Sequence, residues 1–236
     1  MKSLPDQILF FGGTGQAKVC RPIVEHYGSR VIAVIDDTPK LATPFSDVPL
    51  FEGWEKARQF ILDRKKMGTL GFAITIGNPN GRVRLKLHEK MVSEGLVPVN
   101  LIHPTAFIER NAKLGTGIQI MAGAIIGAEA QLKNEVIVNT KASVDHECIL
   151  EDGSEVAPGG TLCGIVRLQV NAWIGAGATV LPRITVGEDA IVGAGSVVIR
   201  DVASQTTVVG IPAQEIGKSK SPSRNLAKSQ SLLPDA

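Results

Sequence analysis

An aliphatic residue recurs at every sixth position from Ile102 to Val198 without a break. The seventeen positions hold only Ile, Leu and Val. Four residues after most of them the side chain is small, as at Ala124, Ala142 and Ala178. This repeat restricts the possible folds more than any other feature of the chain.

A period of six does not fit one face of an α-helix, because six steps of about 100° carry successive apolar residues around the axis. In extended structure six is a multiple of two, so all the repeated side chains point the same way. Short strands separated by turns at this spacing indicate a solenoid that stacks its aliphatic side chains into one column. Ordinary β-sandwich strands would need irregular loops and would lose the register. We therefore predict an all-β solenoid over residues 99–217.

Residues 1–98 instead alternate apolar runs with helix-like segments and short connections. This alternation predicts a small Rossmann-like parallel α/β domain. Pro22 lies inside the first helical segment and suggests that this helix starts late or kinks. Strands are expected at residues 7–11, 30–35, 70–76 and 97–101, with a Pro-rich loop after the second.

A glycine-rich turn, Gly12–Gly15, follows the first expected strand. Such a turn presents backbone N–H groups and a helix N-terminus to a phosphate. Asp36 and Asp37 follow the second strand, where a ribose hydroxyl would be bound. The full G-x-G-x-x-G pattern is missing, because its third glycine position holds Lys18. A plain tight turn, NAD binding and binding of a mononucleotide moiety therefore all remain open.

Composition excludes several classes of function. The 236 residues carry 25 basic and 23 acidic side chains, so nothing points to a nucleic-acid or membrane-surface partner. No apolar run approaches the roughly 18 residues of a membrane span, and the N-terminus does not resemble a secretion signal. Three widely spaced cysteines favour a reducing cytoplasm over a disulfide framework. Residues 218–236 are rich in Ser and Lys, and we expect a disordered tail there.

One segment of the solenoid carries residues suited to chemistry: Asn139 to Cys148, which includes His146 and Glu147. A carboxylate bonded to one imidazole nitrogen raises the basicity of the other, as a general base requires. A lone histidine in a β-rich protein is more often simply solvated or hydrogen-bonded. Cys148 occupies the small-residue place of its repeat, so a buried packing thiol is favoured over a nucleophile.

The chain resembles the nucleotide-sugar N-acetyltransferases of the hexapeptide-repeat family, whose solenoid is a left-handed parallel β-helix. The likeness covers about residues 7–217. It rests on the small α/β domain with its glycine turn, on LIHPTA (101–106), on NTKASVDHEC (139–148) and on VGIPA (209–213). The bacillosamine-pathway, perosamine and viosamine enzymes are of this type, and the sialic acid O-acetyltransferases are related. The resemblance implies acetyl-CoA as co-substrate, no metal, and a homotrimer with active sites between subunits.

Carried over residue by residue, the resemblance implies that His146 is the general base and that Glu147 orients it. Asn139 would help to place the acceptor sugar, and the backbone N–H of Gly164 would hold the thioester carbonyl. Ala176 and Ala194 match positions that line the pantetheine groove. Matches to the nucleotide and hexose contacts are Gly13, Gly15, Asp36, Asp37, Gly77 and Asn78.

Two positions depart from the family. Gln16 stands where the family commonly has His, and its amide would have to replace that nucleotide contact. Glu155 replaces a His of some members near the CoA site, where an acid would repel phosphates unless it faces away. The leading hypothesis is N-acetylation of the 4-amino group of a UDP-, dTDP- or GDP-linked sugar. The alternatives are O-acetylation of the sialic acid type, a non-catalytic nucleotide-sugar scaffold, and an NAD-dependent enzyme with a structural β-helix.

Overall fold

A computed structural model describes residues 4–77 and 79–219. These residues form two compact units. The first comprises residues 4–77 and 87–99, and the second comprises residues 79–86 and 100–219. Asn78 and residues 220–236 of the tail expected over 218–236 lie outside the described residues, and Lys218, the first residue of that expected tail, ends a strand.

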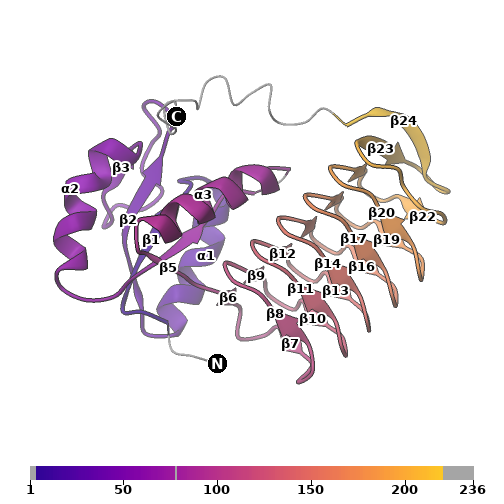
Figure 1. The fold of residues 1–236 in the computed structure, drawn as a ribbon, viewed down its shortest axis with the longest axis horizontal. Coiled ribbons are helices and arrows are strands. Elements are labelled where there is room, and N and C mark those ends of the chain that lie inside the picture. Colours follow the sequence, from indigo (N-terminus) through magenta and orange to yellow (C-terminus); the bar gives the residue numbers. More distant parts are fainter. Residues whose placement is uncertain (1–3, 78, 220–236) are drawn as a thin grey trace. The chain divides into compact units, whose positions relative to one another are not determined.

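The first unit is built on a five-stranded parallel sheet in the order β3-β2-β1-β4-β5 (Figure 1). Its strands are β1 (Gln7–Phe11), β2 (Arg30–Asp36), β3 (Leu50–Glu52), β4 (Leu70–Ile74) and β5 (Val97–Pro98). The helices are α1 (Gly15–His26), α2 (Trp54–Lys65) and α3 (Gly81–Ser93), of which α3 begins in the second unit. The order reverses beside β1, because the chain adds β2 and β3 on one side of it and then β4 and β5 on the other.

The core of this unit follows from its sequence. The central strands β1 and β4 are buried almost throughout, as expected of a parallel sheet covered on both faces. Helix α1 begins at Gly15 and continues through Pro22, so of the late start or kink expected from this proline, the late start does not occur. The short strand β3, in the Pro-rich stretch assigned to a loop, was missed because three residues carry too little pattern.

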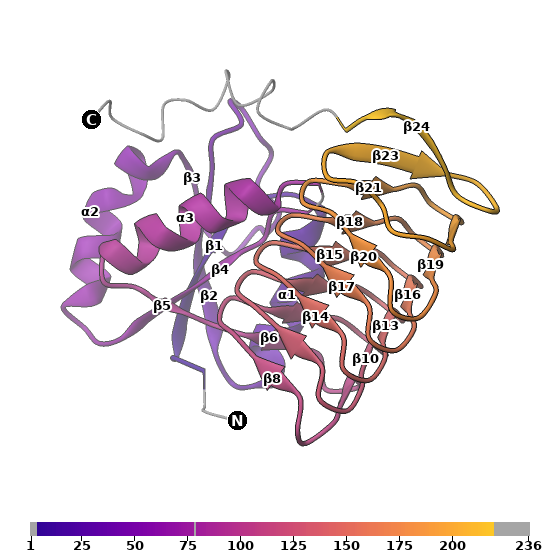
Figure 2. The same cartoon turned by 45° about the vertical axis from the view of Figure 1, so that its right-hand side comes forward.

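The second unit confirms the predicted left-handed β-helix. Each coil has three short strands, and strands pair in parallel with an offset of 18 residues, as Ile126 does with Val144. The strands from β6 to β22 are Leu101–Ile102, Phe107–Ile108, Lys113–Leu114, Gln119–Ile120, Ile125–Ile126, Gln131–Leu132, Ile137–Val138, Ser143–Val144, Ile149–Leu150, Glu155–Val156, Thr161–Leu162, Arg167–Leu168, Trp173–Ile174, Thr179–Val180, Thr185–Val186, Ile191–Val192 and Val197–Val198. Figure 2 shows the coils stacked on one another.

The repeated aliphatic residues form a single column inside the coils, from Ile102 to Val198, with the small residues beside them. At every corner from Gly117 to Gly195 one residue, six after the last, lies in the left-handed region. Where that residue is not glycine it is usually polar, as at Glu135, Asn171 and Asp189. A left-handed φ turns the chain sharply between two strands, which explains how a triangle closes every 18 residues. Residues 18 apart therefore lie one above another along the same corner.

The last coil ends in an antiparallel pair, β23 (Thr206–Val209) and β24 (Gln214–Lys218). Strand β23 continues the sheet of β21, and β24 pairs along its outer edge (Figure 1). Buried Val202, Val208 and Ala213 extend the aliphatic column to this end. None of the helices in the described ranges is long and apolar enough to cross a membrane.

Candidate active site

His146 and Glu147 lie at the corner that follows β13, and their side chains are bonded to each other. The Nδ1 atom of His146 is 2.9 Å from Oε2 of Glu147. Asp145 accepts the backbone N–H of His146 at 2.7 Å, and Glu147 takes the left-handed conformation that turns the corner. Both side chains are about half exposed, at 51% and 53%. The Nε2 atom thus remains free to exchange a proton with a ligand, while Nδ1 is held by an acid.

Gly164 lies one coil further along the same corner, directly beside His146. The register pairs Val144 with Leu162, which places residue 164 next to residue 146. A Cβ at Gly164 would overlap the imidazole ring of His146. The absence of a side chain at this position therefore allows the ring to lie across the neighbouring coil.

At several corners a side-chain oxygen accepts the backbone N–H at the place of the repeat that Gly164 occupies. Asp145 accepts the N–H of His146, Asn139 that of Thr140, and Asp152 that of Asn134. Within the described ranges, the N–H of Gly164 donates to no protein acceptor, although the residue is buried. Buried backbone donors without a partner are rare, so this N–H is suited to donate a hydrogen bond to a ligand oxygen.

Cys148 is close to His146 in sequence but is a buried packing residue. Its thiol donates a hydrogen bond to the carbonyl oxygen of Cys163 at 3.2 Å. Burial raises the pKa of the Cys148 thiol to about 11, so at neutral pH it holds its proton. A thiol in this state is a poor nucleophile.

Asn139, Ala176 and Ala194 lie at a different corner, the one that follows β12, β18 and β21. The side chain of Asn139 is occupied in part by the N–H of Thr140, at 2.8 Å. Both alanines are exposed. The structure therefore groups these three residues with one another and separates them from His146 and Gly164 by one side of the triangle.

Glu155 faces away from solvent. Its side chain is 3% exposed and lies 3.4 Å from the guanidinium of Arg84, which is itself fully buried. The carboxylate is therefore neutralised by a cation of the same unit and does not face a phosphate. Sequence reasoning missed Arg84 because no periodic signal connects a helix residue to a strand residue 71 positions away.

In the first unit, the glycine turn lies where the sheet order reverses, between β1 and β4. Ligands of open α/β sheets bind at this switch point, beyond the carboxyl ends of the strands. The Gly13 N–H donates to Oδ2 of Asp36 at 2.6 Å, and the Thr38 N–H donates to Oδ1 at 2.8 Å. Asp36 thus fixes the turn to the end of β2. Its carboxylate is largely used by backbone donors.

Asp37 is the more available of the two acids. Burial and the neighbouring charge of Asp36 raise the pKa of Asp37, and Lys90 only partly opposes this. Gly15 starts α1, and Thr14 in front of it makes no side-chain cap to the first turn of the helix, whose N-terminus is the end that favours an anion. Gln16 is half-buried on the first turn of α1.

Gly77 follows β4 at the same switch point, and Asn78 lies outside the described residues. Thr75 ties this loop to the glycine turn, because its hydroxyl donates to the carbonyl oxygen of Gly12 at 2.7 Å. Gly12 itself has a φ of 109°, and a Cβ there would overlap the backbone of Thr75. Over the described part of the chain, no group of three or more His, Cys, Asp or Glu side chains is arranged to hold a metal ion.

The known proteins to which this chain is similar in sequence and in structure are transferases. The family model for bacterial transferase hexapeptide repeats matches residues 171–200. A solved variant of perosamine N-acetyltransferase from Caulobacter crescentus, in complex with CoA and GDP-perosamine, is 34% identical with a TM-score of 0.81. The match covers 90% of this chain and 97% of that one.

Two curated relatives match over shorter stretches. GDP-perosamine N-acetyltransferase of Escherichia coli O157:H7 is 30% identical over 59% of this chain and 66% of its own length. Serine acetyltransferase of Synechococcus elongatus is 38% identical over 46% of each chain. The matches thus span about half to two-thirds of these curated relatives.

Proposed function

Because the chain belongs to the hexapeptide-repeat family of nucleotide-sugar N-acetyltransferases, we propose that it transfers the acetyl group of acetyl-CoA to an amine. The acceptor is the 4-amino group of a deoxy sugar carried on a nucleoside diphosphate. The observation that carries this proposal is the corner where His146, bonded to Glu147, lies across Gly164. The imidazole of His146 can accept a proton there, and the backbone N–H of Gly164 beside it can donate a hydrogen bond. Attack of an amine on a thioester requires both groups.

His146 acts as the general base. Its bond to Glu147 favours the tautomer with the proton on Nδ1 and the lone pair on Nε2. As the amine nitrogen attacks the thioester carbon, Nε2 takes a proton from that nitrogen. The negative charge that develops on the carbonyl oxygen is stabilised by the Gly164 N–H. When the carbon–sulfur bond breaks, the proton leaves with CoA as its thiol, and no covalent enzyme intermediate forms.

The first unit binds the nucleotide-linked part of the acceptor. The start of α1 at Gly15 faces the phosphates, and Gln16 takes the neighbouring contact. Asp37 accepts hydrogen bonds from the nucleotide, while Asp36 shapes the turn around Gly13. Gly77 contacts the nucleotide or the hexose from the end of β4, and Asn78, which lies outside the described residues, is assigned the same role from the sequence alone.

A second copy of the chain completes the acetyl-CoA site. Ala176, Ala194 and Asn139 lie at a corner one triangle side away from His146, and six extended residues span up to about 20 Å. A neighbouring subunit that brings this corner beside His146 would join the two groups, as in a homotrimer. Exposed Phe107 and Ile125 are paired on the outer face of the sheet that carries His146, and a neighbour would cover them.

The cell compartment follows from the same proposal. All three cysteines are free, and two of them are buried. Free thiols are typical of proteins in a reducing cytoplasm, which is where we place this enzyme.

The test measures thiol release from acetyl-CoA with UDP-, dTDP- and GDP-linked 4-amino sugars and the matching 4-hydroxy sugars. The wild type and His146→Ala are run in parallel. We expect turnover of one amino sugar and a loss of about 10²–10⁴-fold in the variant, the usual contribution of a positioned base. Turnover of hydroxy sugars alone would assign O-acetylation. Binding without turnover would leave a non-catalytic scaffold.

A further inference from the structure

Residues 37–49 form the loop between β2 and β3, and we call them the Pro-rich loop. All of them belong to the first unit, and all are described; they include no helix or strand. Three prolines, at positions 39, 44 and 49, restrict the backbone. Loops of this length without secondary structure are uncommon in compact domains and usually have a function.

Both ends of the Pro-rich loop are held by the sheet. At its start, the N–H of Thr38 donates to Oδ1 of Asp36 at 2.8 Å, and the other oxygen of this carboxylate accepts the N–H of Gly13. At its end, the N–H of Val34 donates to the carbonyl oxygen of Pro49 at 2.9 Å. The start of the loop and the glycine turn therefore share one carboxylate.

Arg21 of α1 holds the middle of the Pro-rich loop. Its Nη1 and Nη2 atoms donate to the two carboxylate oxygens of Asp47, at 2.7 and 2.5 Å. Its guanidinium also lies over the ring of Phe45, 4.7 Å from the centroid. The hydrogen bonds from Arg21 lower the pKa of Asp47, so the pair is ionic at neutral pH. A two-bond fork of this kind fixes both the distance and the orientation of its partners.

The same guanidinium has a second acid partner, which lies on its own helix. The Nε atom of Arg21 donates to Oε1 of Glu25, one turn further along α1, at 2.6 Å. The bond to Glu25 stays within the helix, whereas the bonds to Asp47 join the helix to the loop. The two acids therefore allow the link to the loop to be removed separately from the link within the helix.

The Pro-rich loop places an apolar side chain, Leu41, against the glycine turn. A Cβ at Gly13 would lie 2.9 Å from Cδ2 of Leu41, closer than carbon atoms in ordinary contact. The backbone of Leu41 is held by its N–H, which donates to the carbonyl oxygen of Thr38 at 3.3 Å. Gly13 is buried but Leu41 is only half-buried, so part of this side chain is accessible beside the turn.

We propose that the Pro-rich loop is one wall of the sugar-nucleotide site, where Leu41 packs on the nucleoside and Arg21 is a positioning residue. Leu41 lies against Gly13, and α1 begins two residues further along, at Gly15. A nucleoside diphosphate with its phosphates at the start of α1 has its nucleoside beside this turn. An aliphatic side chain there covers one face of the base or the ribose. This inference rests on the proposed function.

Arg21 acts on this contact through the position of the loop. It joins the Pro-rich loop to the helix whose start is the expected phosphate contact, so it sets the place of Leu41 relative to the phosphates. Without the bonds to Asp47 the two ends of the loop remain fixed, but its middle is free. Binding of the nucleotide must then order the loop, at a cost in affinity.

The test uses calorimetry on the full chain to measure binding of UDP-, dTDP- and GDP-linked 4-amino sugars and, separately, of CoA. We expect Leu41→Ala to weaken binding of the preferred sugar nucleotide about tenfold, because it removes apolar contact area. Asp47→Asn should weaken it about fivefold, the upper end of what an exposed ion pair contributes. Arg21→Gln should weaken it about tenfold, since the contact with Phe45 is lost as well. The affinity for CoA should stay unchanged in all three variants.

Glu25→Gln is the matched control, because it removes the acid on the helix and leaves the bonds from Arg21 to the loop. It should bind the sugar nucleotide as the wild type does. The double variant of Arg21→Gln and Asp47→Asn should be no weaker than Arg21→Gln, because the two residues act as a unit. Arg21→Lys should be intermediate, since it keeps the charge but loses the fork. In Asp47→Asn the KM for the sugar should rise fivefold, about as much as the Kd, with little change in kcat.

Wild-type sugar-nucleotide affinity in either Leu41→Ala or Asp47→Asn would overturn the inference. An equal loss in Glu25→Gln would also overturn it, because the effect would then come from the stability of α1. So would an equal loss for sugar nucleotide and CoA together with a lower melting temperature. A wild type that binds the sugar nucleotides without transferring acetyl would overturn the proposed function alone. A wild type that binds none of them would overturn both.

Discussion

The change Gly164→Ala separates catalysis from folding in this protein. The backbone of Gly164 is not left-handed, so alanine fits its conformation. Its Cβ, however, would lie 3.0 Å from Cδ2 of His146 and closer still to the other two ring atoms that it meets. Carbon atoms in contact are ordinarily about 3.5–4.0 Å apart, so the imidazole has to move by about 1 Å. Because the ring is half exposed, it can move without disturbing the coil.

We expect this displacement to lower kcat about 100-fold, the usual cost of a 1 Å error in a catalytic group. The free energy of unfolding should change by less than about 1 kcal/mol, since Gly→Ala at a compatible position also restricts the unfolded chain. Thiol release from acetyl-CoA measures the first quantity, and urea unfolding measures the second. A wild-type kcat in Gly164→Ala would refute the argument.

The double variant with His146→Ala provides the control. If Gly164→Ala acts by moving the imidazole, it should cost little more once the imidazole is gone. Independent, multiplying losses would show instead that residue 164 acts through another route, such as its own N–H.

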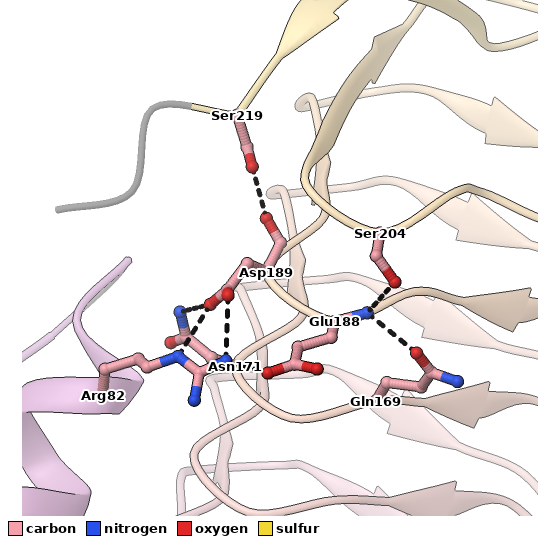
Figure 3. A network of polar contacts seen from close by, with 7 residues as sticks. All are labelled: Arg82, Gln169, Asn171, Glu188, Asp189, Ser204 and Ser219. Atoms are coloured by element: carbon pink, nitrogen blue, oxygen red, sulfur yellow. Dashed lines mark hydrogen bonds and ion pairs between the residues drawn. The ribbon is translucent and has the colours of Figure 1, made fainter. Parts of the chain in front are cut away.

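Three further predictions test buried groups. Cys148→Ala should keep its kcat within about twofold, whereas a role as nucleophile would require a loss of several orders of magnitude; steady-state thiol release decides. Arg84→Met should lower the free energy of unfolding by about 3–5 kcal/mol, because it leaves Glu155 buried without its cation; urea unfolding would contradict this if the midpoint did not move. Burial by itself would raise the pKa of Asp189, but the hydrogen bonds to its carboxylate, above all that from Arg82, outweigh it and lower the pKa (Figure 3). The charge of Asp189 therefore stabilises the fold above the unfolded pKa of about 3.9 and ceases to do so as the pH falls through the folded value. The difference in melting temperature between wild type and Asp189→Asn should therefore shrink below about pH 4, and a difference independent of pH would contradict this.

The parts of the structure that repeat along the chain could be predicted from the sequence. The six-residue repeat places Val144 and Leu162 in the column, and the coil offset then places His146 beside residue 164. The glycine turn and the acids after the second strand could also be found from the sequence, because both features are local, whereas the strand order that brings them to a switch point came from the structure. The order of strands and helices in the first unit could likewise be predicted from the sequence, apart from the three residues of β3.

The sequence did not predict contacts between distant segments. Glu155 occupies an outward-facing strand position that periodicity would assign to solvent, and only the structure shows that Arg84 covers it. The contacts of one coil corner with the start of α3 were missed for the same reason, although the corner residues Glu135, Gly153, Asn171 and Asp189 recur at the coil length. Polar residues are usual at left-handed corners, so these four residues do not stand out in the sequence. The residues that they contact lie on α3, which is not part of the six-residue repeat.

The identity of the product tests the proposed function most directly. The reaction of acetyl-CoA with the preferred sugar nucleotide is analysed by mass spectrometry before and after treatment with hydroxylamine, which cleaves acetyl esters and leaves amides. We expect one acetyl group per amino sugar, stable to hydroxylamine, formed by the wild type and nearly absent with His146→Ala. An acetyl group that hydroxylamine removes, or an amide formed equally well by the variant, would contradict N-acetylation with His146 as the base.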